Sequence, residues 1–368
     1  MSKINDLIKK LCPNGVEYKT LDKVCNINKG KQLNKDGLLS DGVYPVINGG
    51  ITPSGYWNDY NYDENLITIS QGGASAGYIA YQLTKFWAGA HCYVVEDCKD
   101  NIVYKYLYHF LKSKQAALQS SQVGAGIPSV SLKEIYGLKI PLPPLEVQEE
   151  IVRILDKFGE LEAELEEELE ARKSQYEFWR GKLFDNDYEI ERLGDLCSIK
   201  TGSKPKEIFD NGNYEYINAG TTNSGFTDVV NAKGDCVTTP SRGQGGIGFV
   251  GFQTNDFWCG PLCYQIRTQT DKLINKYLYY YMLNHNKFII GLKHEGGVPA
   301  VNIKELQEMP IKVPTLDEQK HIVEVLDKFD ALINDMTEGI PAEIELRRQQ
   351  YEYYRNKLLN FEVMNEKM

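Results

Sequence analysis

Long apolar runs are missing from this chain of 368 residues. A membrane-spanning helix needs about 20 consecutive apolar residues, and no stretch of the sequence approaches that length. The N-terminal segment MSKINDLIKK also lacks the apolar core of a secretory signal peptide. These absences predict a cytoplasmic protein. An apolar fraction of 42% with 25% charged residues is typical of a folded, globular chain.

Cysteine and histidine are too scattered to suggest a disulfide scaffold, a metal site or a catalytic centre. Of the eight cysteines, the closest pair is Cys259 and Cys263, and no second Cys or His pair accompanies it at zinc-binding spacing. The five histidines lie apart, without a pattern of nucleophilic catalysis. The segment GQGGIG has the glycine spacing of a dinucleotide-binding loop, but a strand-like sequence follows where a helix is required. We therefore expect no catalytic residue, no metal and no directly bound cofactor.

Arginine is absent from the first 140 residues, which carry 15 Lys against 12 acidic residues. The whole chain has a net charge of -10, and residues 141–184 alone contribute 12 acidic against 6 basic residues. Much of the acidity therefore belongs to helix-like stretches. The remainder is close to neutral, which neither requires nor excludes a nucleic-acid partner.

The sequence does contain a long internal repeat. LDKVCNINKGK from Leu21 matches LGDLCSIKTGS from Leu193, and IVRILDKF from Ile151 matches IVEVLDKF from Ile322. Further matching segments lie between them in the same order, at an offset of 170 to 172 residues. Repetition over this length predicts two similar domains.

Each copy has two parts of different character. The first is rich in Gly, Asn, Thr and aromatic residues, and its short apolar runs such as NLITIS, GYIAY and HCYVV predict strands. One segment, NIVYKYLYHFLKSKQAAL, has helical periodicity instead. The second part has apolar residues at steps of three and four, which indicates a long amphipathic helix that needs a partner helix. The other copy is the expected partner.

These patterns predict an α+β fold with two similar mixed α/β domains. Two long antiparallel helices join the domains as a coiled-coil stalk with internal pseudo-two-fold symmetry. The expected boundaries are residues 1–145 for the first domain, 146–184 for a central helix, 185–315 for the second domain and 316–361 for a C-terminal helix.

Polar, glycine-rich loops recur in both copies and suit contact with DNA. Glycine lets backbone N–H groups approach phosphates, and Lys, Arg, Asn and Gln can distinguish base edges. Any single loop residue is also explained as part of an ordinary turn. The paired aromatics Phe86-Trp87 and Phe257-Trp258 are expected in the core. Arg242 is the strongest of the candidate DNA-binding residues, which are Lys29, Lys31, Gln32, Asn48, Gln71, Ser75, Lys200, Ser203, Lys204, Asn218, Thr221, Arg242 and Gln244.

Both copies carry a further signature. IPLPPLEVQEEIVRILDKF is followed by RKSQYEFWRGKLF, and KVPTLDEQKHIVEVLDKF is followed by RRQQYEYYRNKLL. This order resembles the specificity subunits of bacterial Type I restriction-modification systems. The resemblance implies two target-recognition domains, each reading one half of a bipartite gapped site in double-stranded DNA. It also implies a non-catalytic subunit that docks two methyltransferase subunits and, through them, restriction subunits. S-adenosylmethionine, ATP and Mg are then expected on those partners.

Two alternatives stay open at this point. One is a recognition subunit of a simpler bifunctional methyltransferase-nuclease, and the other is a two-headed adaptor that binds proteins.

The two helical segments differ in length. The spacing is 18 residues from Phe158 to Tyr176 but 22 from Phe329 to Tyr351, around the segment TEGIPAEIE. Four residues correspond to about 6 Å of helix, or roughly two base pairs. We predict that the central helix sets the gap between the half-sites.

Overall fold

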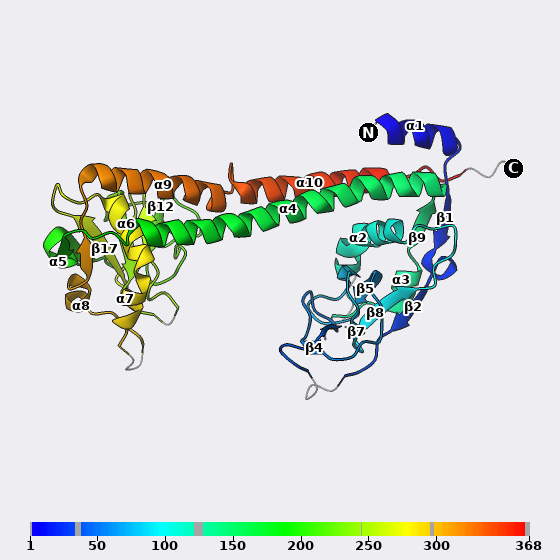
Figure 1. The fold of residues 1–368 in the computed structure, drawn as a ribbon, viewed down its shortest axis with the longest axis horizontal. Helices are drawn as coiled ribbons and strands as arrows, with labels where there is room; N and C mark the ends of the chain where they lie inside the picture. The colour runs from blue at the N-terminus through cyan, green and yellow to red at the C-terminus, as the bar shows by residue number, and fades with distance from the viewer. Residues whose placement is uncertain (1, 34–37, 121–127, 244, 295–297, 365–368) are drawn as a thin grey trace. The chain divides into compact units, whose positions relative to one another are not determined.

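A computed structural model describes residues 2–33, 38–120, 128–243, 245–294 and 298–364. The chain forms two compact units (Figure 1). Unit 1 comprises residues 1–165 and 344–368, and unit 2 comprises residues 166–343. The division passes through the long helical segments, so each unit contains a domain together with the helical portions that pack on it.

Unit 1 is built around an antiparallel sheet with strand order β2-β8-β5-β6. A second sheet, β4-β3-β7, contains the parallel pair β3 and β7, and β1 pairs with β9. The elements of unit 1 outside the long helices are α1 (Ser2–Leu11), β1 (Glu17–Thr20), η1 (Leu21–Lys23), β2 (Asn26–Lys29), β3 (Tyr44–Ile47), β4 (Tyr56–Trp57), β5 (Leu66–Ser70), β6 (Ile79–Gln82), β7 (Trp87–Ala88), β8 (Cys92–Glu96), α2 (Tyr104–Ser120), α3 (Leu132–Tyr136) and β9 (Lys139–Leu142).

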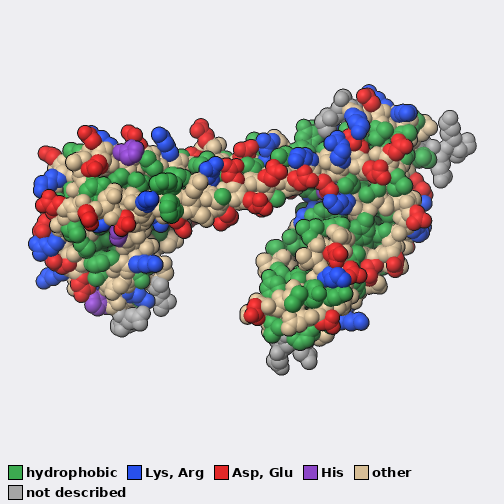
Figure 2. Space-filling view, in the orientation of Figure 1, with side chains coloured by type: hydrophobic (Ala, Val, Ile, Leu, Met, Phe, Trp, Pro, Cys, Tyr) green, Lys and Arg blue, Asp and Glu red, His purple; other side chains and the backbone are tan. Residues whose placement is uncertain are grey.

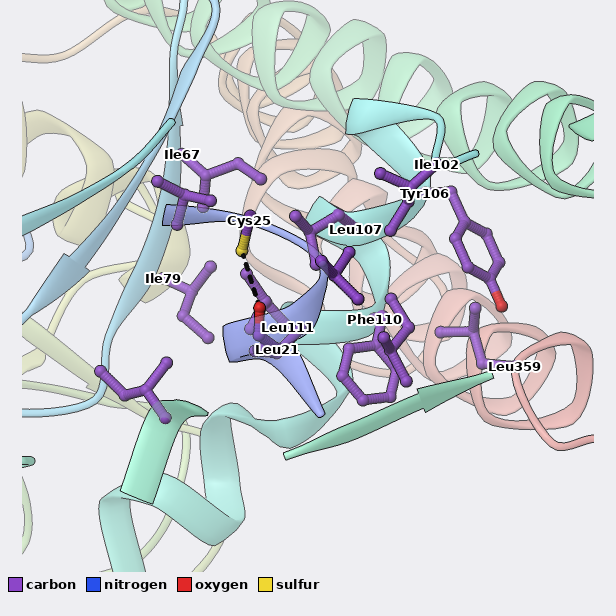
Figure 3. Close-up of a cluster of buried hydrophobic side chains, with 14 of the residues drawn as sticks. Leu21, Cys25, Ile67, Ile79, Ile102, Tyr106, Leu107, Phe110, Leu111 and Leu359 are labelled. Atoms are coloured by element: carbon purple, nitrogen blue, oxygen red, sulfur yellow. Dashed lines mark hydrogen bonds between the residues drawn. The ribbon is translucent and has the colours of Figure 1, made fainter. Parts of the chain in front are cut away.

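Helix α2 covers one face of the four-stranded sheet of unit 1. Its buried residues Tyr106, Leu107 and Leu111 join the core that includes Ile67 and Ile79 of the sheet (Figure 3). Polar contacts also fix the helix, since Tyr104 donates to the carbonyl of Val95 at 2.6 Å. The helix and the three strands predicted for this region are confirmed.

Unit 2 repeats this arrangement. Its four-stranded sheet has the order β11-β17-β14-β15, its three-stranded sheet has the order β13-β12-β16, and β10 pairs with β18. Each of these strands is the counterpart of a strand at the same place in unit 1, which confirms the two similar domains. The elements are β10 (Ile190–Arg192), α5 (Leu193–Leu196), β11 (Cys197–Thr201), β12 (Tyr214–Ile217), β13 (Phe226–Thr227), β14 (Cys236–Pro240), β15 (Gly251–Gln253), β16 (Trp258–Cys259), β17 (Cys263–Thr268), α6 (Asn275–Asn284), α7 (Asn286–Gly291), α8 (Ile303–Gln307) and β18 (Pro310–Lys312).

The long helix α4 (Leu145–Leu183) contains 39 residues and contributes to both units. In unit 1 it packs antiparallel to α10 (Ile340–Leu358). Phe158 stacks on Tyr354, and one turn later along α4 the Glu162 carboxylate accepts at 2.5 Å from Arg348, which lies earlier in α10. In unit 2 it packs on α9 (Leu316–Asn334), where the ring centroids of Tyr176 and Phe329 are 6.1 Å apart. Amphipathic periodicity therefore predicted the pairing correctly.

The C-terminal helical segment is interrupted, which corrects the expectation of one helix over 316–361. Helices α9 and α10 contain 19 residues each, and Asp335–Gly339 lie between them. The Asp335 carboxylate accepts from the backbone N–H of Thr337 at 2.6 Å, and this local bond competes with helical bonding. A Cβ at Gly339 would lie 2.6 Å from the carbonyl oxygen of Ala331. The four extra residues of the second copy are thus accommodated in a break.

A buried glutamine ties each domain to the start of its long helix. Gln148 is fully buried; its Oε1 accepts from Val103 N–H at 2.8 Å, and its Nε2 donates to the carbonyls of Asn101 and Pro143. Gln319, its counterpart in unit 2, accepts from Ile274 N–H at 2.9 Å and makes the same pair of donations. The glutamine of each long-helix motif therefore has a structural role.

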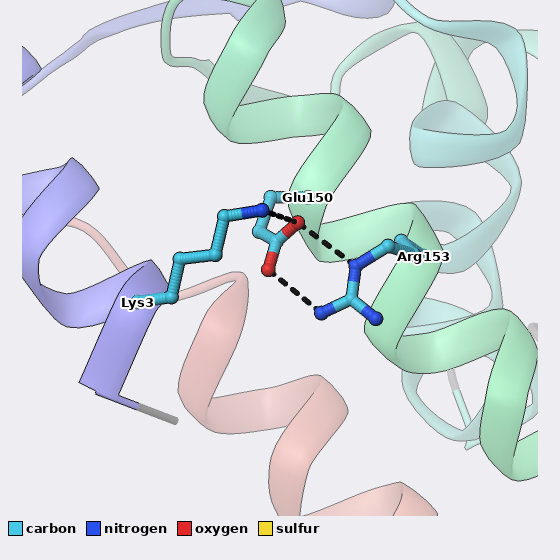
Figure 4. A network of polar contacts seen from close by, with 3 residues as sticks. All are labelled: Lys3, Glu150 and Arg153. Carbon is cyan, nitrogen blue, oxygen red and sulfur yellow. Dashed lines mark hydrogen bonds and ion pairs between the residues drawn. The ribbon is translucent and has the colours of Figure 1, made fainter.

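Helix α1 precedes the first strand of unit 1 and packs beside α4. Lys3 of α1 contacts the Glu150 carboxylate at 3.2 Å, and Arg153 reaches the same carboxylate from one turn along α4 (Figure 4). The pKa of Glu150 is lowered to about 2, chiefly by the bond from Arg153. On the apolar side of α1, Ile4 is fully buried in the unit 1 core.

Candidate nucleic-acid interface

A tight turn lies at the centre of the predicted loops in each unit. In unit 1 the turn is residues 89–91, between β7 and β8; in unit 2 it is residues 260–262, between β16 and β17. We call each of these the central turn. In unit 1, Gln71 donates its backbone N–H to the carbonyl of His91 at 2.8 Å, and Lys31 donates to Ala88 immediately before the turn. In unit 2, Ser241 and Ser203 make the equivalent backbone bonds to Leu262 and Cys259.

An asparagine from a third loop holds each central turn. Asn48 Oδ1 accepts from the backbone N–H of His91 at 3.0 Å, and Asn218 Oδ1 accepts from Leu262 N–H at 3.0 Å. Only glycine fits beside these amides, because a Cβ at Gly89 would lie 2.6 Å from Asn48 Oδ1. The structure thus brings three separately predicted loops together in each unit. It also gives Asn48 and Asn218 a structural role, while DNA contact by either residue stays a prediction.

One further pair of equivalent residues, Asn61 and Asn231, organises the loops and was not predicted. The side chain of Asn61 donates to the carbonyl of Ala88 at 3.1 Å and accepts from its N–H at 2.7 Å. Asn231 makes the same two bonds to Cys259 in unit 2. The only sequence signal was the recurrence of an asparagine five residues before the start of β5 and of β14.

In each aromatic pair the phenylalanine is buried in the core, whereas the tryptophan hydrogen-bonds to a loop. Phe86 and Phe257 are buried in the core, as expected. The indole N–H of Trp87, which is half-buried, donates to the carbonyl of Lys31 at 3.1 Å, and Trp258 donates to the carbonyl of Ser203 at 2.7 Å. The two tryptophans therefore anchor the lysine-bearing loops to the sheet.

The basic candidates are exposed, either on these loops or at the ends of the strands beside them. Lys29 ends β2 and Lys200 lies in β11, while Lys31 and Lys204 follow them; Arg242 follows β14. Among the residues that the structure describes, none of these five cations forms an ion pair. By contrast, both acidic and basic side chains lie along the exposed sides of α4 and α10 (Figure 2). The loop cations are thus available to an external anion.

The remaining candidates occupy varied positions. Gln32 and Thr221 are exposed, and the Gln32 amide donates to the carbonyl of Leu33 at 3.0 Å. Ser203 is exposed on its loop, and Ser75 is half-buried, with its carbonyl accepting from Tyr78. The Oε1 atom of Gln71 is buried and has no partner within the described part of the chain. Gln244 lies outside the described residues.

Cys92, behind the unit 1 turn, has a pKa raised to about 12 by burial, so its thiol stays protonated. Over the described ranges, no three His, Cys, Asp or Glu side chains are grouped as metal ligands. No helix in those ranges is long and apolar enough to cross a membrane. The two units share a hydrogen-bonded turn, around which lie loops that carry cationic and amide side chains.

Comparison with known proteins connects this arrangement to a family. A family model described as the Type I restriction modification DNA specificity domain matches residues 13–171 and 185–346. The chain is 30% identical over 377 residues to a protein of Haemophilus influenzae named as a type I restriction enzyme specificity subunit, with 94% of this chain and 96% of the relative covered. It is 31% identical over 310 residues to the EcoR124I/EcoR124II specificity subunit of Escherichia coli, covering 73% of this chain and 74% of the relative.

Solved structures share the fold. The S subunit of a Type I restriction-modification system from M. genitalium matches with a TM-score of 0.66 at 21% identity, over 94% of this chain and 96% of that one. A chain from a study of assembly and conformational transition of the type I R-M system matches with a TM-score of 0.62 at 17% identity, over 95% and 98% of the two chains. With two matched domains and a relative covered almost end to end, the chain belongs to the family of Type I restriction-modification DNA specificity subunits.

Proposed function

We propose that each unit reads one half of a bipartite, gapped site in double-stranded DNA. The observation that carries the proposal is the repeated central turn, on which the same elements position loop cations in both units. Lysine and arginine attract phosphates, and the arginine fork also recognises guanine. Because the side chains differ between copies, with Lys204 and Arg242 in unit 2 only, the two half-sites would differ in sequence.

The helices would serve as a spacer and as a docking surface. Helix α4 contributes to both units, so its length is the quantity that would set the gap between the half-sites. Near its end, Phe178 and Trp179 are 61% and 43% exposed, and Lys182 lies close to both rings. Near the end of α10, Tyr353 is 59% exposed beside Lys357. Exposed aromatic residues are typical of binding hot spots.

These two similar patches suit two copies of one partner. The partners we propose are two methyltransferase subunits, which would bring S-adenosylmethionine, and restriction subunits that join through them and use ATP and Mg. The complex would act in the cytoplasm, where its DNA target lies.

Methylome sequencing tests the function. The gene is expressed with its methyltransferase in a host that lacks other modification systems, and we expect one new methylated motif with two specified halves and a fixed gap. Arg242→Ala should alter or abolish recognition of one half only, while Arg172→Ala, on the exposed helix, should leave the motif unchanged. Absence of any new motif would favour a protein-binding adaptor and refute the proposal.

The spacer has its own test. Insertion of four residues near Glu166 should lengthen the gap by about one or two base pairs and leave both half-sites unchanged. Four residues inserted in the loop before Gly212, far from the helices in sequence, serve as the control and should leave the gap as it is. An unaltered gap in the helix variant would contradict a spacer role.

A further inference from the structure

The third residue of each central turn has a fixed backbone and a side chain that differs between the copies. This residue is His91 in unit 1 and Leu262 in unit 2. The backbone N–H of His91 donates to Asn48 Oδ1 at 3.0 Å, and its carbonyl accepts from the Gln71 N–H at 2.8 Å. Leu262 makes the same two backbone bonds to the equivalent loops of unit 2. In both copies, two neighbouring loops therefore hold this residue in place.

The His91 side chain is exposed, and within the described ranges its imidazole forms no hydrogen bond or ion pair. The loop that carries Asn48 passes close to it without a side chain at the nearest position, since a Cβ added at Gly49 would lie 3.4 Å from His91 Cβ. A neutral imidazole has one donor and one acceptor. With only two rotatable bonds on a fixed backbone, the ring can take few positions. Its donor and acceptor are thus available to an external partner at a defined place.

The position of His91 suits a base better than a phosphate. Phosphates are bound mainly by long cationic side chains such as that of Lys31, whose backbone lies beside the turn, whereas bases are distinguished by donors and acceptors on their edges. A side chain that distinguishes bases has to be held in one place by the scaffold. We infer that His91 hydrogen-bonds to the edge of one base in the half-site that unit 1 reads. This inference rests on the proposed function.

Leu262 gives the same position of unit 2 a different chemistry. Its side chain is apolar and half-buried, and it follows the exposed Pro261. The apolar group that a base presents in the major groove is the methyl group of thymine. Leu262 therefore contacts a thymine methyl group in the second half-site, and the two half-sites differ at this position.

Initial rates of methylation by the assembled complex test the inference. The substrates are duplexes in which each specified position of the wild-type motif is replaced in turn by the other three bases. For His91→Ala, the preference for the native base should fall about 3- to 10-fold at one position of one half-site, the effect of one hydrogen bond. For Leu262→Ala, the preference for thymine should fall about 4-fold at one position of the other half-site, the effect of burying one methyl group. All other positions should keep their preferences.

Two controls separate base reading from a structural role. Asp100→Ala changes an exposed residue beyond the far end of β8 from the turn and should leave every preference unchanged. The melting temperature of His91→Ala should stay within about 2 °C of wild type, because the backbone bonds of the turn remain. A larger loss of stability, or an equal loss of preference at every position of the half-site, would assign His91 a structural role and overturn the inference.

Failure of this inference is distinct from failure of the proposed function. If His91→Ala keeps all the wild-type base preferences, the inference is overturned while the reading of two half-sites stands. If the wild-type complex methylates no specific motif, both are overturned.

Discussion

Replacing Gln148 with leucine should destabilise unit 1 far more than a surface change would. Leucine keeps most of the side-chain volume in a fully buried position but makes none of the three hydrogen bonds. The carbonyl of Pro143 then stays buried without its partner, which costs about 1–3 kcal/mol, and the two partly exposed bonds to Val103 and Asn101 add about 0.5–1.5 kcal/mol each. We expect a loss of about 2–6 kcal/mol in the free energy of unfolding.

Urea denaturation measures this loss, and hydrogen exchange shows where it occurs. Amides at the start of α2 should exchange faster in Gln148→Leu, while those of α6 should not change. Gln319→Leu should instead speed exchange at the start of α6 and leave α2 unchanged, at a similar cost in stability, because Gln319 makes the same three bonds in unit 2. Glu149→Gln, at an exposed neighbour on α4, is the control and should change stability by less than about 0.5 kcal/mol. A cost below 1 kcal/mol for either leucine variant would refute the role assigned to these glutamines.

Three further predictions concern α1 and the central turns. The pKa of Glu150 is lowered to about 2 from an ordinary 4.5, chiefly by Arg153 on the same helix and also by Lys3 of α1. This stabilises the folded unit above pH 4.5, and the part that comes from Lys3 stabilises the docked α1; both should be lost as the pH falls from 4.5 toward 2. Because Lys3 and Arg153 are largely exposed, the stability lost should be about 1 kcal/mol. Relative to the intrinsic rate, hydrogen exchange of the α1 amides should become faster as the pH falls over this range in the wild-type chain but not in Glu150→Gln. Gly89→Ala should displace the Asn48 amide and weaken DNA binding by unit 1, as measured by methylation of its half-site. Arg242→Ala should change the melting temperature by less than about 2 °C yet lower DNA affinity, and a large loss of stability would contradict its placement as an exposed loop cation.

Periodicity and repetition were sufficient to predict the elements and the two domains. The strands around Ile67 and Val94 consist of short runs in which apolar residues are consecutive or alternate with polar ones, and the apolar residues of the α2 segment have helical spacing. Local sequence and tertiary packing therefore favour the same structure. The break at Asp335–Gly339 was harder to predict because its surroundings are strongly helical. A side-chain bond from Asp335 and a close backbone approach at Gly339 outweigh those local preferences.

The interface was predictable in composition but not in geometry. Glycine-rich loops with Asn48 and Lys31 were identifiable because they recur, and the structure does bring them to one turn. Their recurrence could not reveal that the Asn48 oxygen is engaged by the turn or that Asn61 bridges the backbone of Ala88, because those bonds join residues 27 and 43 positions apart. The sequence therefore indicated which loops matter, whereas the roles of single amides depend on tertiary contacts.

The interruption changes the meaning of the four-residue difference between the copies. In unit 1, Phe158 stacks on Tyr354, while in unit 2 the equivalent Phe329 contacts Tyr176. In the sequence repeat, Tyr354 aligns with Trp179 and not with Tyr176. The residue that contacts the phenylalanine therefore lies three positions, about one helical turn, earlier in the first copy of the motif than in the second. The four extra residues of the second copy thus accompany a change in the register of the packed helices. They do not lengthen a continuous helix. Because a break can accept or release residues while the flanking contacts persist, the spacer prediction rests on α4, which is continuous over its 39 residues.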